Sequence, residues 1–310
     1  MGFFFKRLPI FAIPLLMATL ISCNKDEEIT VDNPETPTPE TPGNGDFTVI
    51  EYMPAPGQFI NDPASGFENI TTMAEACHLA QERLAKNYYV SLGAWGGYLI
   101  VKTNTPIQNS GNYDFSIGGN SFDTSSEAGI VWVMQDTNKN GLPDDEWYQL
   151  KGSEFDNPDF IKDYQVTYYK ADIKTDIEWK DNLGNNGVIS WNGNYHSQDS
   201  YYPAWIKEDN YTLTGSLLPP NIILNSTTGQ WSALPYKWGY ADNFGEDSAT
   251  VSVNGIKICK NFFKISDAVK SDGSPADISS IDFVKVQTGV NAVLGWLGEI
   301  STEICGFFRE

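Results

Sequence analysis

One stretch of the chain has the hydrophobic period of an amphipathic helix. Between positions 72 and 86, apolar side chains recur at steps of three and four residues, at Met73, Cys77, Ala80 and Leu84. Residues at this spacing share one face of an α-helix, and Thr71 or Thr72 can cap the backbone N–H groups of its first turn. We therefore expect a single helix here, with Cys77 on its buried face.

Elsewhere the pattern is that of β-strands. Short runs of β-branched and aromatic residues, bounded by Gly, Asn and Asp, cover positions 97–103, 113–117, 130–134, 164–168, 211–213, 257–263, 281–288 and 298–304. Many short strands without alternating helices predict a mainly β fold. We expect residues 47–310 to form a single β-sandwich or jelly-roll domain with one helix near its N-terminus. Long aromatic loops are expected at about 172–245.

The first 22 residues have the pattern of an export signal. Lys6 and Arg7 precede an apolar run that is too short to span a bilayer as a helix. The run ends at Leu20-Ile21-Ser22-Cys23, which resembles a bacterial lipobox. This pattern predicts removal of residues 1–22 and attachment of lipid to the thiol of Cys23. The alternative is a removed signal followed by an incidental cysteine.

Residues 23–46 are expected to form a tether. The segment 33–45 repeats Pro, Glu and Thr, and stiff prolines with repelling carboxylates keep such a chain extended. The acidic run at 24–28 is similar to the signal that sends some commensal Gram-negative lipoproteins to the outer face of the outer membrane, although a solvated tether alone also explains it. We expect a protein held on the outer membrane by its lipid alone, facing the exterior.

The overall charge excludes one class of partner. The chain has 40 acidic and 20 basic residues and a net charge of −20, and loss of Lys6 and Arg7 with the signal would make it −22. Binding to nucleic acid or to anionic lipid depends on clustered Lys and Arg, so nucleic acid is not expected as a partner. Cys259 and Cys305 could form a disulfide in an oxidising compartment, or remain thiols.

The segment QDTNKNGLPDDEW, residues 135–147, concentrates side-chain oxygens around Gly141. Calcium takes six to eight oxygen ligands, and a loop with Asp or Asn at positions 1, 3 and 5 followed by Gly can wrap it. The candidate ligands are Asp136, Asn138, Asn140, the carbonyl of Leu142, and Asp144.

The calcium interpretation is incomplete at one position. Trp147 stands where an EF-hand has its bidentate Glu, so a more distant carboxylate must complete the shell, and the candidates are Glu127, Asp145 and Glu299. Three interpretations stay open: a structural calcium site, a metal-free polar hairpin, and a metal in direct contact with a ligand.

Motifs for catalysis are absent from the sequence. The chain contains no GxSxG, HExxH or P-loop pattern. His196 could act as a base, but we interpret it as a hydrogen-bonded surface residue. The carboxylate pairs Asp144/Asp145 and Glu299/Glu303 could serve a glycosidase, yet such pairs arise by chance among 40 acidic residues. We do not expect an enzyme.

Aromatic residues are the most distinctive candidates for binding. Trp132 and Trp296 lie in apolar runs and are expected in the core. The rings set among loop residues are candidates to contact a ligand, because a flat ring offers a large apolar face at small entropic cost. They are Trp179, Trp191, Tyr195, Tyr201, Tyr202, Trp205, Trp231, Trp238 and Tyr240, with Tyr236 close by. The alternative is that these rings fold back and anchor the loops to the sandwich.

Six stretches together resemble a known family, and the likeness covers nearly all of residues 47–310. They are 49–61, 118–131, 238–244, 263–269, 281–288 and 295–302. In these stretches the chain resembles gut-commensal "cell surface protein" lipoproteins, which are commonly encoded with outer-membrane systems for the uptake of corrinoids (vitamin B12).

The resemblance implies a function but no ligand residues. It implies a surface accessory that captures a corrinoid or helps pass it to an outer-membrane TonB-dependent transporter. A corrin is a broad, partly apolar face fringed with amides, which aromatic and Asn side chains could meet. The alternatives are a glycan-binding lipoprotein and a structural subunit that docks on a transporter.

Overall fold

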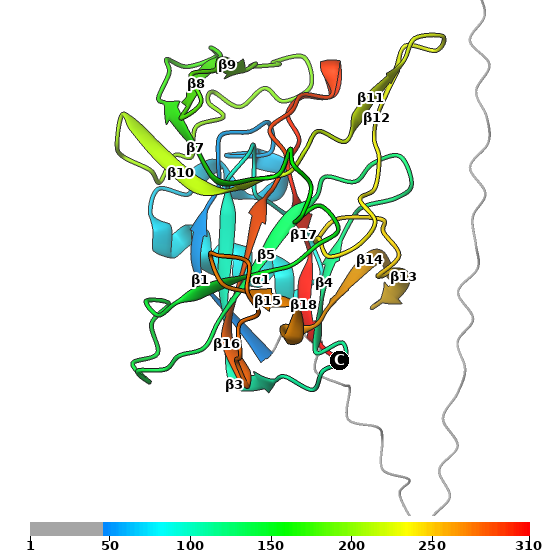
Figure 1. The fold of residues 1–310 in the computed structure, drawn as a ribbon. Helices are drawn as coiled ribbons and strands as arrows, with labels where there is room; N and C mark the ends of the chain where they lie inside the picture. Colours follow the sequence, from blue (N-terminus) through cyan, green and yellow to red (C-terminus); the bar gives the residue numbers. More distant parts are fainter. Residues whose placement is uncertain (1–45) are drawn as a thin grey trace, which may run out of the picture. The chain divides into compact units, whose positions relative to one another are not determined.

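A computed structural model describes residues 46–310. The predicted signal, Cys23 and the tether up to residue 45 lie outside the described residues. In the described part, antiparallel sheets and a single α-helix form a mainly β fold that is consistent with a β-sandwich, as predicted (Figure 1).

The largest sheet has six antiparallel strands. In spatial order they are β1 (Phe47–Met53), β3 (Tyr98–Gln108), β16 (Ser280–Thr288), β5 (Gly129–Met134), β6 (Trp147–Leu150) and β15 (Ala268–Val269). One face of the sheet carries branched apolar side chains into the core, among them Val101, Val133 and Val284, all almost fully buried. The alternation of strand side chains turns Lys285 and Trp132 to the other face, where they pair across β16 and β5.

Two four-stranded sheets complete the core. One is β13 (Ser248–Val253), β14 (Ile256–Phe263), β4 (Phe115–Gly119) and β18 (Gly306–Arg309), and the other is β10 (Asn210–Leu217), β7 (Ile161–Tyr169), β8 (Ile177–Asp181) and β9 (Asn186–Ile189). Phe115, Phe307, Val166 and Leu213 from these sheets belong to the same hydrophobic cluster as the large sheet. That shared cluster is the core of the sandwich.

Smaller elements lie between and beyond these sheets. They are the hairpin of β11 (Ile222–Asn225) and β12 (Gln230–Ala233), the pair of β2 (Val90–Ser91) and β17 (Glu303–Ile304), and 3-10 helices at Pro63–Ser65, Phe67–Asn69, Ile265–Asp267 and Gly295–Leu297. The predicted long loops at 172–245 therefore contain regular strands from β8 to β12. The hairpin of β11 and β12 projects from the domain (Figure 1).

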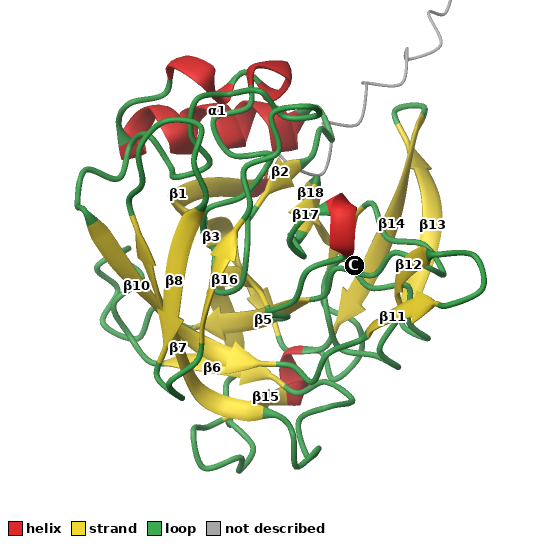
Figure 2. Ribbon diagram, turned by 90° about the horizontal axis from the view of Figure 1, so that it is seen from above, coloured by secondary structure: helices red, strands yellow, loops and turns green. Residues whose placement is uncertain are grey.

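The predicted helix is present as α1 (Met73–Ala85). Thr72 caps it: the Thr72 hydroxyl accepts from the backbone N–H of Glu75 at 3.2 Å, and the Glu75 carboxylate accepts from the backbone N–H of Thr72 at 3.1 Å. Ala76, Ala80 and Leu84 are buried against β1, β2 and β18 (Figure 2). Cys77 is only half-buried, because the buried face is turned slightly from the predicted one.

One local prediction was wrong, and the structure decides one alternative that the sequence left open. The strand predicted at 298–304 is reduced to Glu303–Ile304, because positive φ angles at Gly295 and Gly298 turn the chain just before it. Cys259 and Cys305 are both buried free thiols. Cys259 pairs with Gly119 and Cys305 bonds to Gly118, on opposite edges of β4, so roughly two strand spacings of 4.8 Å separate them, too far for a disulfide.

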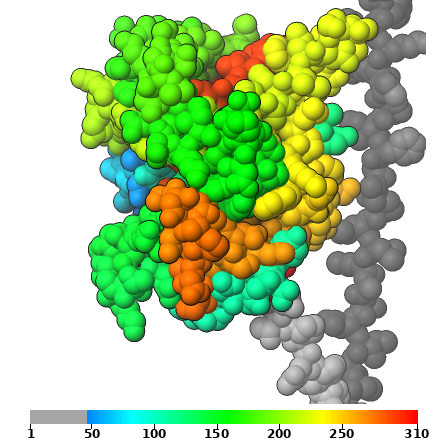
Figure 3. All heavy atoms as spheres, viewed as in Figure 1, coloured from blue at the N-terminus to red at the C-terminus, as the bar shows by residue number. Residues whose placement is uncertain are grey.

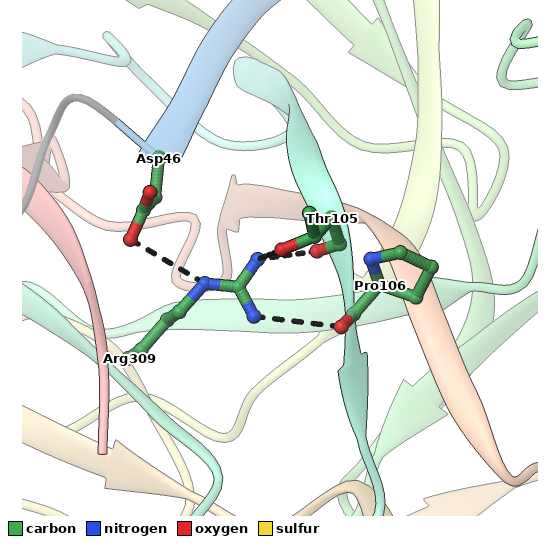
Figure 4. Close-up of polar contacts among 4 residues, drawn as sticks. All are labelled: Asp46, Thr105, Pro106 and Arg309. Atoms are coloured by element: carbon green, nitrogen blue, oxygen red, sulfur yellow. Dashed lines mark hydrogen bonds and ion pairs between the residues drawn. The ribbon is translucent and has the colours of Figure 1, made fainter.

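The two ends of the described chain are joined by Arg309 (Figure 4). Its Nε lies 3.4 Å from the carboxylate of Asp46, and its guanidinium donates to the hydroxyl and carbonyl of Thr105 and to the carbonyl of Pro106. This contact connects the residue before β1 with β3 and with the last strand, β18.

Candidate functional site

Several of the rings predicted to bind a ligand lie in the core. Tyr201, Tyr202, Trp205, Tyr236 and Tyr240 are buried, and Tyr201 is only 1% exposed. Their polar atoms bond inward: the Trp205 indole donates to the carbonyl of Tyr52 at 3.3 Å, and the Tyr202 hydroxyl donates to that of Glu208 at 2.8 Å. These rings anchor the 172–245 segment to the sandwich and present no face to solvent. For these five buried rings, the prediction of contact with a ligand was therefore wrong.

Four other candidate rings are half-buried. They are Trp179, Trp191, Trp231 and Trp238. Trp191 donates from its indole to the carbonyl of Gln198 at 3.0 Å, and the indole of Trp231 lies directly against Gly295. The edges of these rings support the neighbouring loops, so each has at most part of its face available for a ligand.

The largest exposed rings are Tyr195 and Trp296. They are 69% and 64% exposed, and their centroids lie 6.2 Å apart with the planes tilted by 41°. The prediction that Trp296 is a core residue was wrong, because the turn at Gly295–Leu297 carries its ring outward. Trp132, predicted in the core, is half-buried on the outer face of the large sheet.

A cavity of about 320 Å³ is connected to this pair through the sequence neighbours of the two rings, and neither ring lines the cavity itself. Phe59 lines the cavity and packs edge-on against His196, the neighbour of Tyr195, with 4.8 Å between ring centroids. Burial lowers the pKa of His196. Trp296 adjoins the same region, since the carbonyl of the next residue, Leu297, accepts from the side chain of Gln58 at 2.7 Å. The remaining lining residues are Asp62, Ser65, Phe67, Arg83, Tyr89, Ser91, Asn120, Glu127 and Glu303.

Two carboxyl groups that line this cavity, those of Glu127 and Glu303, lie beside a third, that of Asp242, from another part of the chain. Oxygens of Glu127, Asp242 and Glu303 all lie within 4.8 Å of one another. Asp242 accepts from the backbone N–H groups of Asn120 and Glu303 at 3.1 and 3.0 Å. Glu303 accepts from the Ser91 hydroxyl at 2.7 Å and hydrogen-bonds to Glu127. We call these three residues the carboxyl cluster.

Burial away from water is the largest influence on the pKa of the three carboxyls in the cluster. It raises the pKa of Glu127 and Asp242 well above the usual range, and repulsion from Glu303 adds to the effect. Burial raises the pKa of Glu303 as well, and brings that of nearby Glu299 to about 7. Burial therefore favours the protonated form of these carboxyls, and a protonated carboxyl can both donate and accept hydrogen bonds.

A guanidinium lines the same cavity. Arg83 extends from α1 and donates to the carbonyls of Tyr89 and Ser65 at 2.8 and 3.0 Å. The cavity thus combines a fixed cation, hydrogen-bonding carboxyls and the apolar rings of Phe59 and Phe67. This mixture suits a ligand with both polar and apolar groups. The carboxyl oxygens could also surround a cation, although hydrogen bonds already satisfy them without one.

No local pattern in the sequence predicted this site. Glu127 and Asp242 are separated by more than a hundred residues, and only the fold brings them together. Four of the six stretches that carry the family resemblance reach the cavity or the carboxyl cluster: 49–61 supplies Phe59, 118–131 supplies Glu127, 238–244 supplies Asp242, and 295–302 ends beside Glu303.

The acidic loop lies elsewhere. It follows β5, whereas Glu127 precedes that strand, so roughly nine residues at 3.3 Å each separate Glu127 from Asp136. Glu299 accepts from the backbone of Gln58 at 2.7 Å, beside the cavity. The prediction that Glu127 or Glu299 completes a calcium shell on the loop was therefore wrong. In Figure 3 the loop forms the green lobe at lower left.

Within the loop, the predicted ligands do converge. The amides of Asn138 and Asn140 donate to the Asp144 carboxylate at 3.2 and 3.1 Å, and the backbone of Gly141 donates to Asp136 at 2.8 Å. The amide oxygens of Asn138 and Asn140 accept from the backbone N–H groups of Asn140 and Leu142 at 2.9 and 2.8 Å. Asp145 instead bonds to the hydroxyl and backbone of Thr137, which lowers the pKa of its carboxyl.

Comparisons with known proteins do not assign the chain to a family. No protein-family model matches the chain, and no curated protein matches it. Among the described residues, no helix has the length and apolar character needed to cross a bilayer. Inference of function thus depends on the residues and their geometry.

Proposed function

We propose that the chain is a surface lipoprotein that binds a small nutrient ligand, a corrinoid, at the cavity beside Tyr195 and Trp296. One observation carries the proposal: the exposed rings of Tyr195 and Trp296 are sequence neighbours of residues that contact Gln58 and Phe59, at a cavity that combines apolar rings with carboxyls and a guanidinium. Such a combination is typical of ligand sites.

The shape of the site limits how a corrinoid would bind. About 320 Å³ is too small for a whole macrocycle, so only a peripheral group would enter. A primary amide is suited to this cavity, because its NH₂ can donate to Glu303 while its carbonyl accepts from protonated Glu127 or from Arg83. The macrocycle would then lie over Tyr195 and Trp296.

The location and the metal are part of the same proposal. A lipid on Cys23 and the tether would hold the site on the outer face of the outer membrane, where a TonB-dependent transporter could receive the ligand. Calcium at Asp136, Asn138, Asn140, Leu142 and Asp144 would brace the loop between β5 and β6, away from the ligand. In this scheme the metal has a structural role only.

Calorimetry with cyanocobalamin tests the proposal. The chain from residue 23, with Cys23→Ser, should bind at micromolar concentrations, and the double substitution Tyr195→Ala/Trp296→Ala should weaken binding at least tenfold, about 1.4 kcal/mol. Tyr113→Ala is the matched control, because Tyr113 is also exposed but its ring packs against Phe262 instead of against Tyr195 or Trp296. No heat and no co-elution with wild type would reject the corrinoid.

A glycan is the second candidate. Two exposed rings at a mutual tilt of 41° can stack on successive sugar units, and the carboxyls below can bond to hydroxyl groups. A glycan array distinguishes the two ligands, since glycan binding should also collapse in the ring-deleted variant while cyanocobalamin gives no signal.

A further inference from the structure

A second cavity, of about 350 Å³, lies on the outer face of the six-stranded sheet. It shares no lining residue with the cavity above the carboxyl cluster. Its floor is formed by β5 and β6, and Phe155, Lys162 and Lys270 line it from neighbouring segments. In Figure 3 the bright green segment around 150–165 borders the orange segment around 268–280 on the face in view.

The strand register aligns three polar side chains on this face. Lys285 of β16 pairs with Trp132 of β5, and Trp132 pairs with Gln149 of β6. Directly paired residues of antiparallel strands project to the same side of the sheet. The ammonium, the indole N–H and the amide therefore form one row across three strands, and the last two side chains line the cavity.

Two nitrogen donors in this row have no partner among the described residues. They are Nε1 of Trp132 and Nε2 of Gln149, and both atoms are buried. Gln149 is only 5% exposed, and its other amide atom, Oε1, accepts from the Ser216 hydroxyl at 2.8 Å. Buried N–H groups in proteins nearly always have an acceptor, so two neighbouring orphans beside a cavity indicate a missing acceptor group.

Positive charge gathers at the same place in an acidic chain. Lys162 and Lys270 line the cavity, and the Lys285 ammonium lies 4.8 Å from the ring centroid of Trp132 and 5.3 Å from that of Trp147. In the part of the chain that the structure describes, none of these lysines forms an ion pair with a carboxylate. Two carboxylates, Glu146 and Asp163, also line the cavity and are exposed like Lys162 and Lys270, and Glu146 accepts from the Tyr148 hydroxyl at 2.8 Å.

The walls indicate what the rest of the ligand looks like. Trp147 and Phe155 supply aromatic surface, and Lys162 lies 4.5 Å from the Phe155 ring centroid. A water occupies roughly 30 Å³ of liquid volume, so the cavity can hold a molecule with a ring and a polar head.

We propose that this cavity binds a small aromatic carboxylate, whose oxygens accept from Trp132 and Gln149 while its ring packs between Trp147 and Phe155. Lys162 and Lys270 would attract the anion and screen it from the acidic surface. The site is separate from the proposed corrinoid site, and each can fail without the other.

Titration with benzoate tests this proposal, with benzyl alcohol as the uncharged control of similar size. Benzoate should bind the full mature chain at least tenfold more tightly than benzyl alcohol. Gln149→Leu, which removes the amide N–H groups at nearly constant volume, and Trp132→Phe, which removes the indole N–H with part of the ring, should each weaken benzoate binding at least fivefold. Lys162→Met/Lys270→Met should do the same. Lys180→Met is the matched control, because Lys180 also lies over a ring, that of Tyr169, outside the cavity.

A second measurement does not depend on the variants. In ¹⁵N-labelled wild type, the indole N–H resonance of Trp132 should move on addition of benzoate and stay in place with benzyl alcohol. The proposal is overturned if that resonance does not move, if the two probes bind equally, or if Gln149→Leu and Trp132→Phe fold and bind benzoate within twofold of wild type.

Discussion

The chain places carboxylates in two concentrations, one at each end of β5. The loop after the strand gathers Asp136, Asp144 and Asp145 within ten residues, exposed or half-exposed to solvent. The carboxyl cluster before the strand gathers Glu127, Asp242 and Glu303 from three distant segments, beside a cavity. Only the acidic loop is visible in the sequence, whereas in the carboxyl cluster burial raises the pKa of Glu127 and Asp242 well above the usual range.

Access to water explains the difference. In the loop, the Thr137 hydroxyl and backbone N–H groups stabilise the ionised form of Asp145 and so lower the pKa of its carboxyl. In the cluster, desolvation and mutual repulsion favour the protonated form. The same functional group is therefore a potential metal ligand in one place and a hydrogen-bond donor in the other.

The largest expected difference is in stability. Asp242→Ala would leave backbone N–H groups of Asn120 and Glu303 without an acceptor in the core, and would force alanine into a φ of 50°. We expect a loss of about 4 kcal/mol in the free energy of unfolding, measured by urea denaturation. Asp136→Ala in the loop should cost about 1 kcal/mol in calcium-free buffer, since water can replace its carboxylate.

Asp242→Asn is the matched control for the buried position. It keeps an acceptor oxygen and tolerates a positive φ, so it should lose less than half as much stability as Asp242→Ala. If alanine at 242 cost no more than alanine at 136, burial would not be what distinguishes the two regions.

The next effect is a dependence on pH. Glu299 has a folded pKa of about 7, above its value of about 4.3 in the unfolded chain. The folded protein therefore keeps a proton that the unfolded chain loses between these values, so stability is greatest at the acid end of this window and falls as pH rises through it. Glu299 alone would account for about 3 kcal/mol between pH 4.5 and 7.5, checked by denaturation at a series of pH values.

Glu299→Gln should flatten this pH profile, because the amide oxygen can still accept from the backbone of Gln58. Glu68→Gln, at an exposed position, should leave the profile unchanged. A wild-type stability that rises between pH 5 and 7 would contradict the raised pKa.

The smallest effect concerns calcium. At tenfold excess over its Kd, calcium bound to the loop should stabilise the protein by about 1.4 kcal/mol, seen as a rise in Tm that chelation reverses. Asp136→Asn/Asp144→Asn should abolish the rise, whereas Asp242→Asn should retain it. The opposite result would assign the metal to the carboxyl cluster.

Local patterns in the sequence predicted much of the fold. The helix followed from the spacing of Met73 to Leu84 and from Thr72, and strands such as β5 and β16 from their runs of branched residues. The predicted strand at 298–304 failed because Gly295 and Gly298 take positive φ, which apolar content does not reveal. The ring of Trp296 is exposed for the same reason.

The site could be predicted only in part. Tyr195 was identified from its polar neighbours, but Tyr201 and Tyr240 have similar neighbours and are buried. Exposure of a ring depends on which way the folded loop turns, and a short sequence window does not contain that information. The residues of the carboxyl cluster come together through the pairing of β2 with β17 and of β4 with β14. No local motif in the sequence therefore marks the cluster.

The contact made by Arg309 has a mechanical consequence. Force arriving through the residues before Asp46 would reach β1 first, and β1 is the edge strand of its sheet, which could be peeled away one hydrogen bond at a time. Arg309 holds Asp46 against Thr105 and Pro106 of β3 and belongs to a strand of another sheet. A pulling force applied before Asp46 would therefore be distributed over two sheets at the first residue that the structure describes.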